Sequence, residues 1–332
     1  MPELPEVETV ARDLRPRLVG ATIVGARTNW ARTLRSGDPV SFEAAVAGRE
    51  ILAVGRRGKQ LVIELSGDAA LTIHLKMTGQ LFVVPAGTPE DPYVRLVLEL
   101  GDGREMHFRD IRKFGKIGLY GRDPATGELV DEVGGASVFA SIGPEPLAET
   151  FTLRDFRQRL RRRKGRLKPL LVDQSFLAGV GNIYADEALW RARLHPLRPA
   201  PSLRPPDERR LYEAIRAVLV EAVDRRGSSI DDYTAPDGDG SMQERLDVYQ
   251  RTGEPCPRCG HPVKRIVIGA RSTHFCSWCQ RLSAAERRNA RSVLRTMTGG
   301  TVRHGRRWTE QTRLAAASRR ASARVAAGGG AG

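Results

Sequence analysis

Apolar residues in the first third of the chain mostly follow the two-residue repeat of β-strands. Residues 71–77 alternate between apolar and polar side chains, and residues 94–98 form a short, largely apolar run. A Gly-Asp-Gly turn follows at residues 101–103. Short strands separated by turns, without long helices between them, predict an antiparallel β-sandwich over residues 21–120. Before it, residues 5–18 carry apolar positions at helical spacing and predict one flanking helix.

Beyond residue 151 the apolar positions recur at the helical spacing of about 3.6 residues instead. The clearest helix covers residues 207–226, and its apolar face is expected in the core. Residues 121–150 are richer in Gly, Pro, Asp and Glu, which is typical of a linker. We therefore expect an α+β multidomain fold with an N-terminal β-sandwich domain at residues 1–135, a linker at 136–150 and a helical domain at 151–250.

The four cysteines of the chain stand in two Cys-x2-Cys pairs. Cys256 and Cys259 form the first pair, and after sixteen further residues Cys276 and Cys279 form the second. This spacing is typical of a structural zinc site, in which four thiolates surround one Zn²⁺ tetrahedrally. Two disulfides are the alternative, and a cytosolic setting disfavours them. We place a zinc finger with a β-hairpin between its cysteine pairs at residues 251–282.

The charge of the chain is strongly positive and unevenly distributed. The formal net charge is +15, and residues 281–332 hold twelve arginines against two glutamates. Such a chain is expected to bind polyanions, above all nucleic acid. A helix is expected near residues 284–297, and from residue 299 onward the bias to Arg, Ala, Ser and Gly predicts disorder. We therefore treat residues 283–332 as a basic, disordered tail that adds salt-sensitive DNA affinity.

No apolar run in the sequence approaches the ~18 residues that a transmembrane helix needs. Three of the first eight residues are glutamates, which is unlike a signal peptide. We expect a cytoplasmic protein with no membrane partner.

The N-terminus carries the most specific candidate chemistry. Once the initiator Met1 is removed, Pro2 becomes a terminal secondary amine, and a pKa of about 8 leaves much of it neutral near physiological pH. A neutral amine can attack a sugar aldehyde carbon and form a Schiff base. Glu3 follows directly and is a candidate for general acid/base catalysis. The structural alternative is that these residues only begin a helix whose dipole the glutamates complement.

The opening string Met-Pro-Glu-Leu-Pro-Glu resembles the N-terminus of the formamidopyrimidine-DNA glycosylase and endonuclease VIII family, whose nucleophile is an N-terminal proline. Leu4 favours the formamidopyrimidine branch. The resemblance covers roughly residues 1–280 and includes five separated motifs in the family's order. It implies catalytic roles for Pro2 and Glu3, and a DNA-binding helix–two-turn–helix motif that includes residues 173–187.

Two loops of the predicted sandwich resemble those that the family inserts into DNA. They are His-Leu-x-Met-Thr-Gly at residues 74–79 and Arg-x-Phe-Gly at residues 112–115. The resemblance implies that Met77, Arg112 and Phe114 fill the gap left by an extruded nucleotide. Such contacts offset an unstacking cost on the order of a few kcal/mol. From the pattern alone, Met77 is a core methionine, and Phe114 is equally an ordinary aromatic at a strand end.

Further contacts with the DNA backbone follow from the same resemblance. Lys59, in a turn between strands, matches the family lysine that grips phosphate near the lesion and supports catalysis. Lys168, Asn182 and Arg271 match residues that bind phosphates beside the lesion. Glu187 matches a glutamate near the proline, with a role in catalytic support or in orientation. From the pattern alone, Lys59 is a solvated turn lysine, and Asn182 caps a helix whose start suits a phosphate.

The activity that the resemblance implies is base-excision repair of oxidised purines, namely 8-oxoguanine and formamidopyrimidines, by a DNA glycosylase that is also an abasic-site lyase. A Schiff base to Pro2 would lead to β- and δ-elimination. The implied partner is damaged double-stranded DNA, the implied cofactor one structural Zn²⁺, and the expected state a monomer at the bacterial nucleoid. The Ser, Asp and Gly bias of residues 228–240 predicts a mobile loop, whose sequence departs from the family's version and leaves base preference open. The alternatives are an endonuclease VIII-like enzyme for oxidised pyrimidines and a non-catalytic protein that binds damaged DNA.

Overall fold

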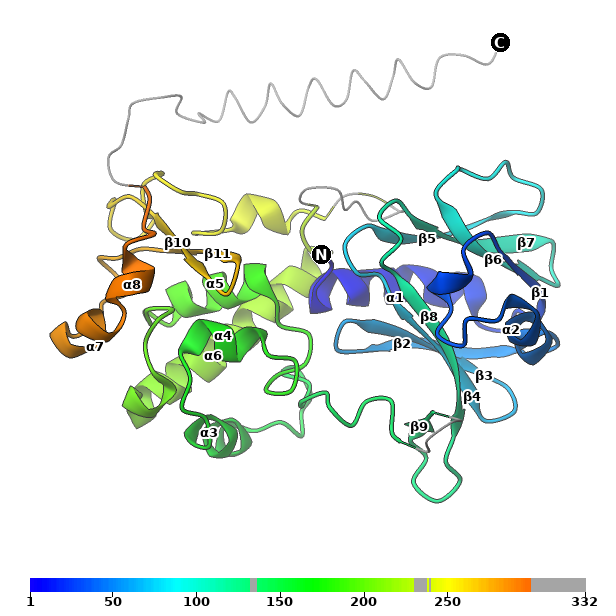
Figure 1. Cartoon of the computed structure of the whole chain (residues 1–332), viewed down its shortest axis with the longest axis horizontal. Helices are drawn as coiled ribbons and strands as arrows, with labels where there is room; N and C mark the ends of the chain where they lie inside the picture. Colours follow the sequence, from blue (N-terminus) through cyan, green and yellow to red (C-terminus); the bar gives the residue numbers. More distant parts are fainter. Residues whose placement is uncertain (132–135, 230–237, 239, 300–332) are drawn as a thin grey trace, which may run out of the picture.

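The structure of the chain is a computed structural model that describes residues 1–131, 136–229, 238 and 240–299. A strand-rich body and a helix-rich body lie side by side along the long axis of the molecule, and the N-terminus lies between them (Figure 1). This α+β arrangement confirms the predicted fold class. Within the described ranges, no helix is both long enough and apolar enough to cross a membrane.

Helix α1 (Leu4–Leu18) joins the two bodies. It begins after Glu3, whose backbone N–H donates to the Glu6 side chain at 2.8 Å, and a proline in the first turn supplies a backbone angle already suited to a helix. Val7 and Leu14 pack in the core of the sandwich, whereas Leu4 packs in the core of the helix-rich body. The N-terminus is therefore held where the two bodies meet.

The strand-rich body is an antiparallel β-sandwich, as predicted. One sheet has the strand order β1 (Ile23–Thr28), β6 (Val94–Leu100), β7 (Arg104–Asp110) and β5 (Gly79–Pro85). The other has the order β2 (Ile51–Arg57), β3 (Gln60–Leu65), β4 (Ala69–His74), β8 (Lys116–Arg122) and β9 (Leu129–Val130). Apolar residues of both sheets and of α1 form one core. Helix α2 (Pro39–Val46) and the short 3-10 helix η1 (Ala31–Thr33) complete this body.

The helix-rich body contains α3 (Leu153–Arg161), α4 (Leu167–Val172), α5 (Asn182–Arg191) and α6 (Pro205–Asp224), with the 3-10 helices η2 (Ala200–Ser202) and η3 (Met242–Arg245). Helix α6 carries the amphipathic repeat predicted for residues 207–226, and it begins earlier because proline is favoured in the first helical turn. The loop between α4 and α5 lies against the start of α1, where Leu4 donates its N–H to the carbonyl of Gly179 at 3.0 Å.

The C-terminal part of the described chain is more ordered than predicted. Strands β10 (Lys264–Ile268) and β11 (Arg271–Phe275) form the expected hairpin. After it, α7 (Ala284–Asn289) and α8 (Arg291–Leu294) replace the single helix expected at residues 284–297. Apolar residues of this segment share a small core with the hairpin. The prediction of a disordered tail was therefore wrong for residues 283–299, because apolar positions at helical spacing give the segment a face to bury.

Two further predictions concern parts of the chain that lie outside the described residues. These are the disorder of residues 300–332 and most of the loop predicted at residues 228–240, of which only residues 228, 229, 238 and 240 are described.

Candidate active site

A cleft of about 780 Å³ lies at the junction of the two bodies and brings together residues from distant parts of the chain. Five of the residues singled out in the sequence line it, namely Pro2, Glu3, Met77, Asn182 and Arg271. They come from the start of α1, the β4–β5 loop, the start of α5 and the first residue of β11. The sequence places these residues in separate motifs, and the fold places them around one cavity.

The carboxylate of Glu3 is buried and held by the first turn of α5. Its two oxygens accept the backbone N–H groups of Gly181 at 2.8 Å and Ile183 at 2.9 Å. The positive end of the α5 dipole also favours a negative charge at this position. This corrects the expectation of a phosphate site at this helix start, because Glu3 already occupies it.

Gly181 is required by the close approach of these groups. A Cβ atom on Gly181 would lie 2.2 Å from Cδ of Glu3 and 2.6 Å from Nζ of Lys59. Both distances are shorter than van der Waals contact allows. Gly181, and not Asn182 as predicted, is the N-cap residue of α5, and Asn182 is the first residue of the helix.

Lys59 lies in the turn between β2 and β3, but it is not a solvated turn lysine. Its side chain is buried, and its ammonium nitrogen lies beside the Glu3 carboxylate at Gly181. Burial lowers the pKa of Lys59, and the charge of Glu3 counteracts part of that shift. The cation thus lies in the interior of the site.

Glu6 is a buried cleft residue that the sequence pattern assigned only to the first turn of a helix. It accepts hydrogen bonds from the Tyr184 hydroxyl and from the backbone N–H groups of Glu3 and Ser228, the latter at 2.7 Å. Burial, followed by the charge of Glu3, raises the pKa of Glu6. The periodicity of α1 gave no sign of this role, because Tyr184 and Ser228 reach Glu6 only through the tertiary fold.

Lys168 is buried in an ion pair and is not exposed to a phosphate as predicted. Its ammonium group donates to Asp186 at 2.6 Å and to the carbonyl of Asn182 at 2.7 Å, and its side chain is 2% exposed. Burial lowers its pKa, which the Asp186 carboxylate opposes. Asp186 also accepts the backbone N–H of His274 at 2.9 Å. Lys168 therefore links α5 to β11, and it does not line the cleft.

Glu187 is also buried, and it holds the chain that leads to the zinc finger. Its carboxylate accepts the backbone N–H groups of Asp247, Val248 and Tyr249 at 2.8–2.9 Å. Burial raises the pKa of Glu187 to about 7. Of these residues only Tyr249 lines the cleft, so the geometry favours orientation over direct catalytic support.

Asn182 and Arg271 connect α5 to the hairpin at one wall of the cleft. The side-chain amide of Asn182 donates to the carbonyl of Ser272 at 3.0 Å, and the guanidinium of Arg271 is exposed. Arg265 and Tyr249 line the same wall and were not singled out in the sequence. Arg265 could have been found there, because it lies in the predicted hairpin.

The two sandwich loops proposed as a wedge lie close together. Asp110 joins them, because its carboxylate accepts the Thr78 hydroxyl from one loop and the Gly115 N–H, at 2.7 Å, from the other. Met77 is 39% exposed and Phe114 is 50% exposed. The Arg112 guanidinium lies 5.1 Å from the centroid of the Phe114 ring. The prediction that Met77 is a core residue is wrong, and the side chains of Met77 and Phe114 are both available to a ligand.

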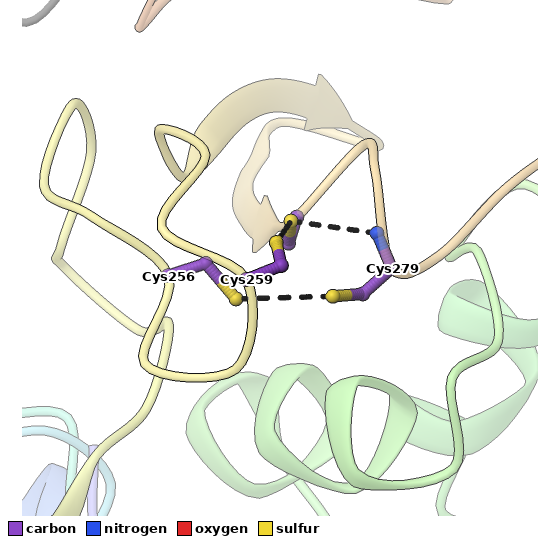
Figure 2. Close-up of side chains that lie close together, drawn as sticks. Cys256, Cys259 and Cys279 are labelled. Atoms are coloured by element: carbon purple, nitrogen blue, oxygen red, sulfur yellow. Dashed lines mark hydrogen bonds between the residues drawn. The ribbon is translucent and has the colours of Figure 1, made fainter.

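The four cysteines converge on one point beside the hairpin, as Figure 2 shows for Cys256, Cys259 and Cys279. All four sulfur atoms lie within 4.8 Å of one another, and none forms a disulfide. Zinc–sulfur bonds of about 2.3 Å around a tetrahedral ion require such a cluster. The Cys256 sulfur also accepts the indole N–H of Trp190 at 3.3 Å. This donor set fits one structural zinc, which would fix the hairpin against the helix-rich body.

Comparisons with protein families cover most of the chain. Residues 1–117 match the formamidopyrimidine-DNA glycosylase N-terminal domain, and residues 142–234 match the formamidopyrimidine-DNA glycosylase H2TH domain. Residues 253–282 match the zinc finger found in FPG and IleRS.

Similar proteins match over all or nearly all of their length. A formamidopyrimidine-DNA glycosylase of Herpetosiphon aurantiacus is 48% identical over 282 residues, which cover 84% of this chain and 100% of the relative. Wild-type Fpg (MutM) of Lactococcus lactis, in complex with DNA containing N7-benzyl-Fapy-dG, matches with a TM-score of 0.76 and 36% identity over 85% of this chain and 100% of that chain. The MutM (FPG) protein of Thermus thermophilus matches with a TM-score of 0.73 and 44% identity, over 84% of this chain and 98% of that chain.

Proposed function

The chain belongs to the formamidopyrimidine-DNA glycosylase family, and from this premise we propose that it removes oxidised purines from duplex DNA through a Schiff base to Pro2. Membership makes it a bifunctional DNA glycosylase and abasic-site lyase of base-excision repair. The observation that carries the proposal is that Pro2 lines the cleft beside Glu3, a carboxylate immobilised by the start of α5.

The proposed reaction begins with the nitrogen of Pro2, which removal of Met1 converts to a secondary amine. Its lone pair attacks C1′ of the damaged nucleotide, the bond from C1′ to the base breaks, and the base leaves with the electron pair and a proton. Opening of the sugar ring then gives a Schiff base between C1′ and Pro2. Successive loss of the protons at C2′ and C4′ breaks the C–O bonds on the 3′ and then the 5′ side.

Glu3 is the group placed to move protons during these steps. Its carboxylate has one fixed orientation, because two backbone N–H groups of the α5 start hold its oxygens. Lys59, buried beside it, supplies a positive charge next to the carboxylate that moves the protons. The zinc cluster does not line the cleft, which supports a structural and not a chemical role for the metal.

The exposed loops give the chain a means to hold an extruded nucleotide. Met77 borders the cleft, and Phe114 with Arg112 lies on the neighbouring loop that Asp110 ties to it. An apolar wedge of this kind replaces the stacking that the flipped base loses. Arg271 on the opposite wall supports a contact with the phosphate backbone.

Oxidised purines are the substrates that the comparisons support best. The structure of the Lactococcus lactis protein contains DNA with a Fapy-dG derivative. The Herpetosiphon aurantiacus relative, which matches this chain over its full length, is a formamidopyrimidine-DNA glycosylase. Damaged duplex DNA is accordingly the proposed partner. We expect the enzyme to act as a monomer.

Borohydride trapping tests the chemistry directly. The full-length protein is incubated with an 8-oxoguanine:cytosine duplex and, in parallel, with an oxidised-pyrimidine duplex, each in the presence of borohydride. We expect a covalent adduct with the 8-oxoguanine duplex that maps by peptide mass to residue 2. Pro2→Gly tests the nucleophile, and Glu8→Gln, a nearby residue of α1 that does not line the cleft, is the matched control.

The other outcomes separate the alternatives. An adduct with the pyrimidine duplex alone would assign the chain to an endonuclease VIII-like specificity. Tight binding of both duplexes with no adduct, from protein whose Met1 has been shown to be removed, would refute the Schiff-base mechanism and favour a non-catalytic binder.

A further inference from the structure

The segment after the zinc finger, residues 283–299, packs along the hairpin that carries Arg271. It lies beyond the zinc-finger match, which ends at residue 282, and the Herpetosiphon aurantiacus relative in its full length corresponds to 84% of this chain. We propose that this segment, here called the C-terminal brace, is a positioning element that holds the DNA-binding hairpin in place. The proposal rests on the proposed contact between Arg271 and DNA.

The brace covers the open edge of β10. The backbone N–H of Arg265 donates to the carbonyl of Thr298 at 3.1 Å, and the N–H of Thr298 donates back to Arg265 at 2.8 Å. Two residues along the strand, the N–H of Val267 donates to the hydroxyl of Thr296 at 3.2 Å. Alternate amides of an antiparallel strand face the same edge, so these two point away from β11. An isolated two-stranded hairpin is marginally stable, and the brace acts as a partial third strand.

Apolar contacts hold the brace against the hairpin. Ala290 is buried, and Val293 and Leu294 pack in the same small core. On the hairpin side this core contains Ile266 of β10 and Phe275 of β11. Val293 and Leu294 lie in α8 and Ala290 directly precedes it, so one side of the segment faces the hairpin.

The other end of the brace is anchored to the helix-rich body. The Glu286 carboxylate accepts the Ser202 hydroxyl at 3.0 Å and lies 3.8 Å from the Arg198 guanidinium. The carbonyl of Asn289 accepts a hydrogen bond from Arg166 at 3.1 Å. The brace therefore links η2 and the start of α4 to the edge of β10.

This link bears on the cleft because the hairpin forms one of its walls. Arg265 and Arg271 both line the cleft, and the Ser272 carbonyl accepts a hydrogen bond from the Asn182 side-chain amide. The zinc fixes the base of the hairpin through the cysteines, whereas the brace fixes the edge strand. Loss of the brace would leave the zinc bound and the positions of both arginines less defined.

The test uses the full-length, zinc-loaded protein and separates packing from charge. Leu294→Asn combined with Thr298→Pro removes the core contact and the strand pairing but leaves every charge in place. Thr296→Val, a milder variant, removes the hydroxyl that accepts from Val267 and that donates to the Val293 carbonyl at 2.8 Å. The matched control replaces the four exposed arginines of the brace by glutamine and leaves its packing intact, at Arg287, Arg288, Arg291 and Arg295.

Hydrogen exchange in the free protein is measured first, because it does not depend on any DNA contact. We expect the amides of Arg265 and Val267 to exchange at least tenfold faster in the double variant, and that of Val267 also in Thr296→Val. The arginine control and a chain shortened after Gly299 should match the wild type. Unchanged exchange at both amides in a zinc-loaded double variant would overturn the proposal, whatever the enzyme's chemistry proves to be.

Binding to a duplex that contains an abasic-site analogue is measured second. An arginine–phosphate hydrogen bond accounts for about a tenfold change in Kd, so the double variant should raise the Kd by about that factor. In an Arg265→Ala/Arg271→Ala background the same double variant should add less than about a twofold change, because the brace acts through these two arginines. A full additional tenfold loss in that background would show that the brace does not act through the hairpin. The chain shortened after Gly299 should lose only salt-dependent affinity.

Discussion

Substituting Lys168 by methionine distinguishes a positioning lysine from a phosphate-binding one. Methionine keeps an unbranched side chain in the same space but removes the ammonium group that donates to Asp186 and to the carbonyl of Asn182. Both members of the ion pair are almost completely buried, at 2% exposure for Lys168 and 1% for Asp186. The substitution therefore leaves a carboxylate in the interior without its counter-charge.

The expected effect is large. Removing one partner of a buried ion pair typically costs about 3–5 kcal/mol, because the remaining charge stays desolvated. That is a substantial part of the roughly 5–15 kcal/mol by which native domains are stable. Replacing Asp186 by asparagine in the same chain removes the orphaned charge, so the double variant should recover about 2 kcal/mol relative to the sum of the single losses.

Urea unfolding at a fixed zinc concentration measures this prediction, together with duplex binding over a range of salt concentrations. Lys164→Met is the matched control, because Lys164 is exposed and its loss should change the free energy of unfolding by less than about 0.5 kcal/mol. A phosphate-binding Lys168 would behave in the opposite way. The free energy of unfolding of Lys168→Met would be unchanged. The plot of the logarithm of the DNA-binding constant against the logarithm of salt concentration would become less steep, by about 0.9 in the magnitude of its slope. That result would refute the positioning role.

Three further predictions follow from the site. Gly181→Ala places a Cβ 2.2 Å from Cδ of Glu3, so single-turnover base release should fall roughly 10²-fold, whereas Gly165→Ala, with no atom within 4 Å of its Cβ, should match the wild type. The pKa of Glu187 is raised to about 7 in the folded state. The contribution of this carboxyl to the free energy of unfolding is therefore fully present below about pH 4.5 and is lost as the pH rises through 7. The unfolding free energy of the wild type should fall relative to that of Glu187→Gln across this window, and a constant difference would contradict the shift. Chelation of zinc or Cys256→Ser should abolish duplex binding, and metal analysis should find one zinc in each folded chain.

The residues that the sequence identified correctly are those whose chemistry is written in short, local patterns. The spacing of the cysteines predicts the zinc cluster, since Cys-x2-Cys pairs place two sulfurs on one turn of chain. The alternation of apolar and polar residues predicts the strands of the sandwich, and the N-terminal string indicates the family that the comparisons confirm. Met77 shows the limit of periodicity. Its place in an alternating run predicts a core residue, but β4 ends at His74 and Met77 lies exposed in the loop that follows.

The tertiary structure alone decided which charged groups meet. Glu3 accepts hydrogen bonds from the start of α5, 178 residues away in the chain, and so turns an expected phosphate site into a carboxylate site. Lys168 and Lys59 are buried because the surrounding elements close over them, which no local pattern records. A helix was expected near residues 284–297, but its place along the edge of β10 is decided only by the fold. The amino-acid sequence thus determines the secondary-structure elements and supplies the reactive groups. Which of these groups meet, and how deeply they are buried, depends on long-range packing.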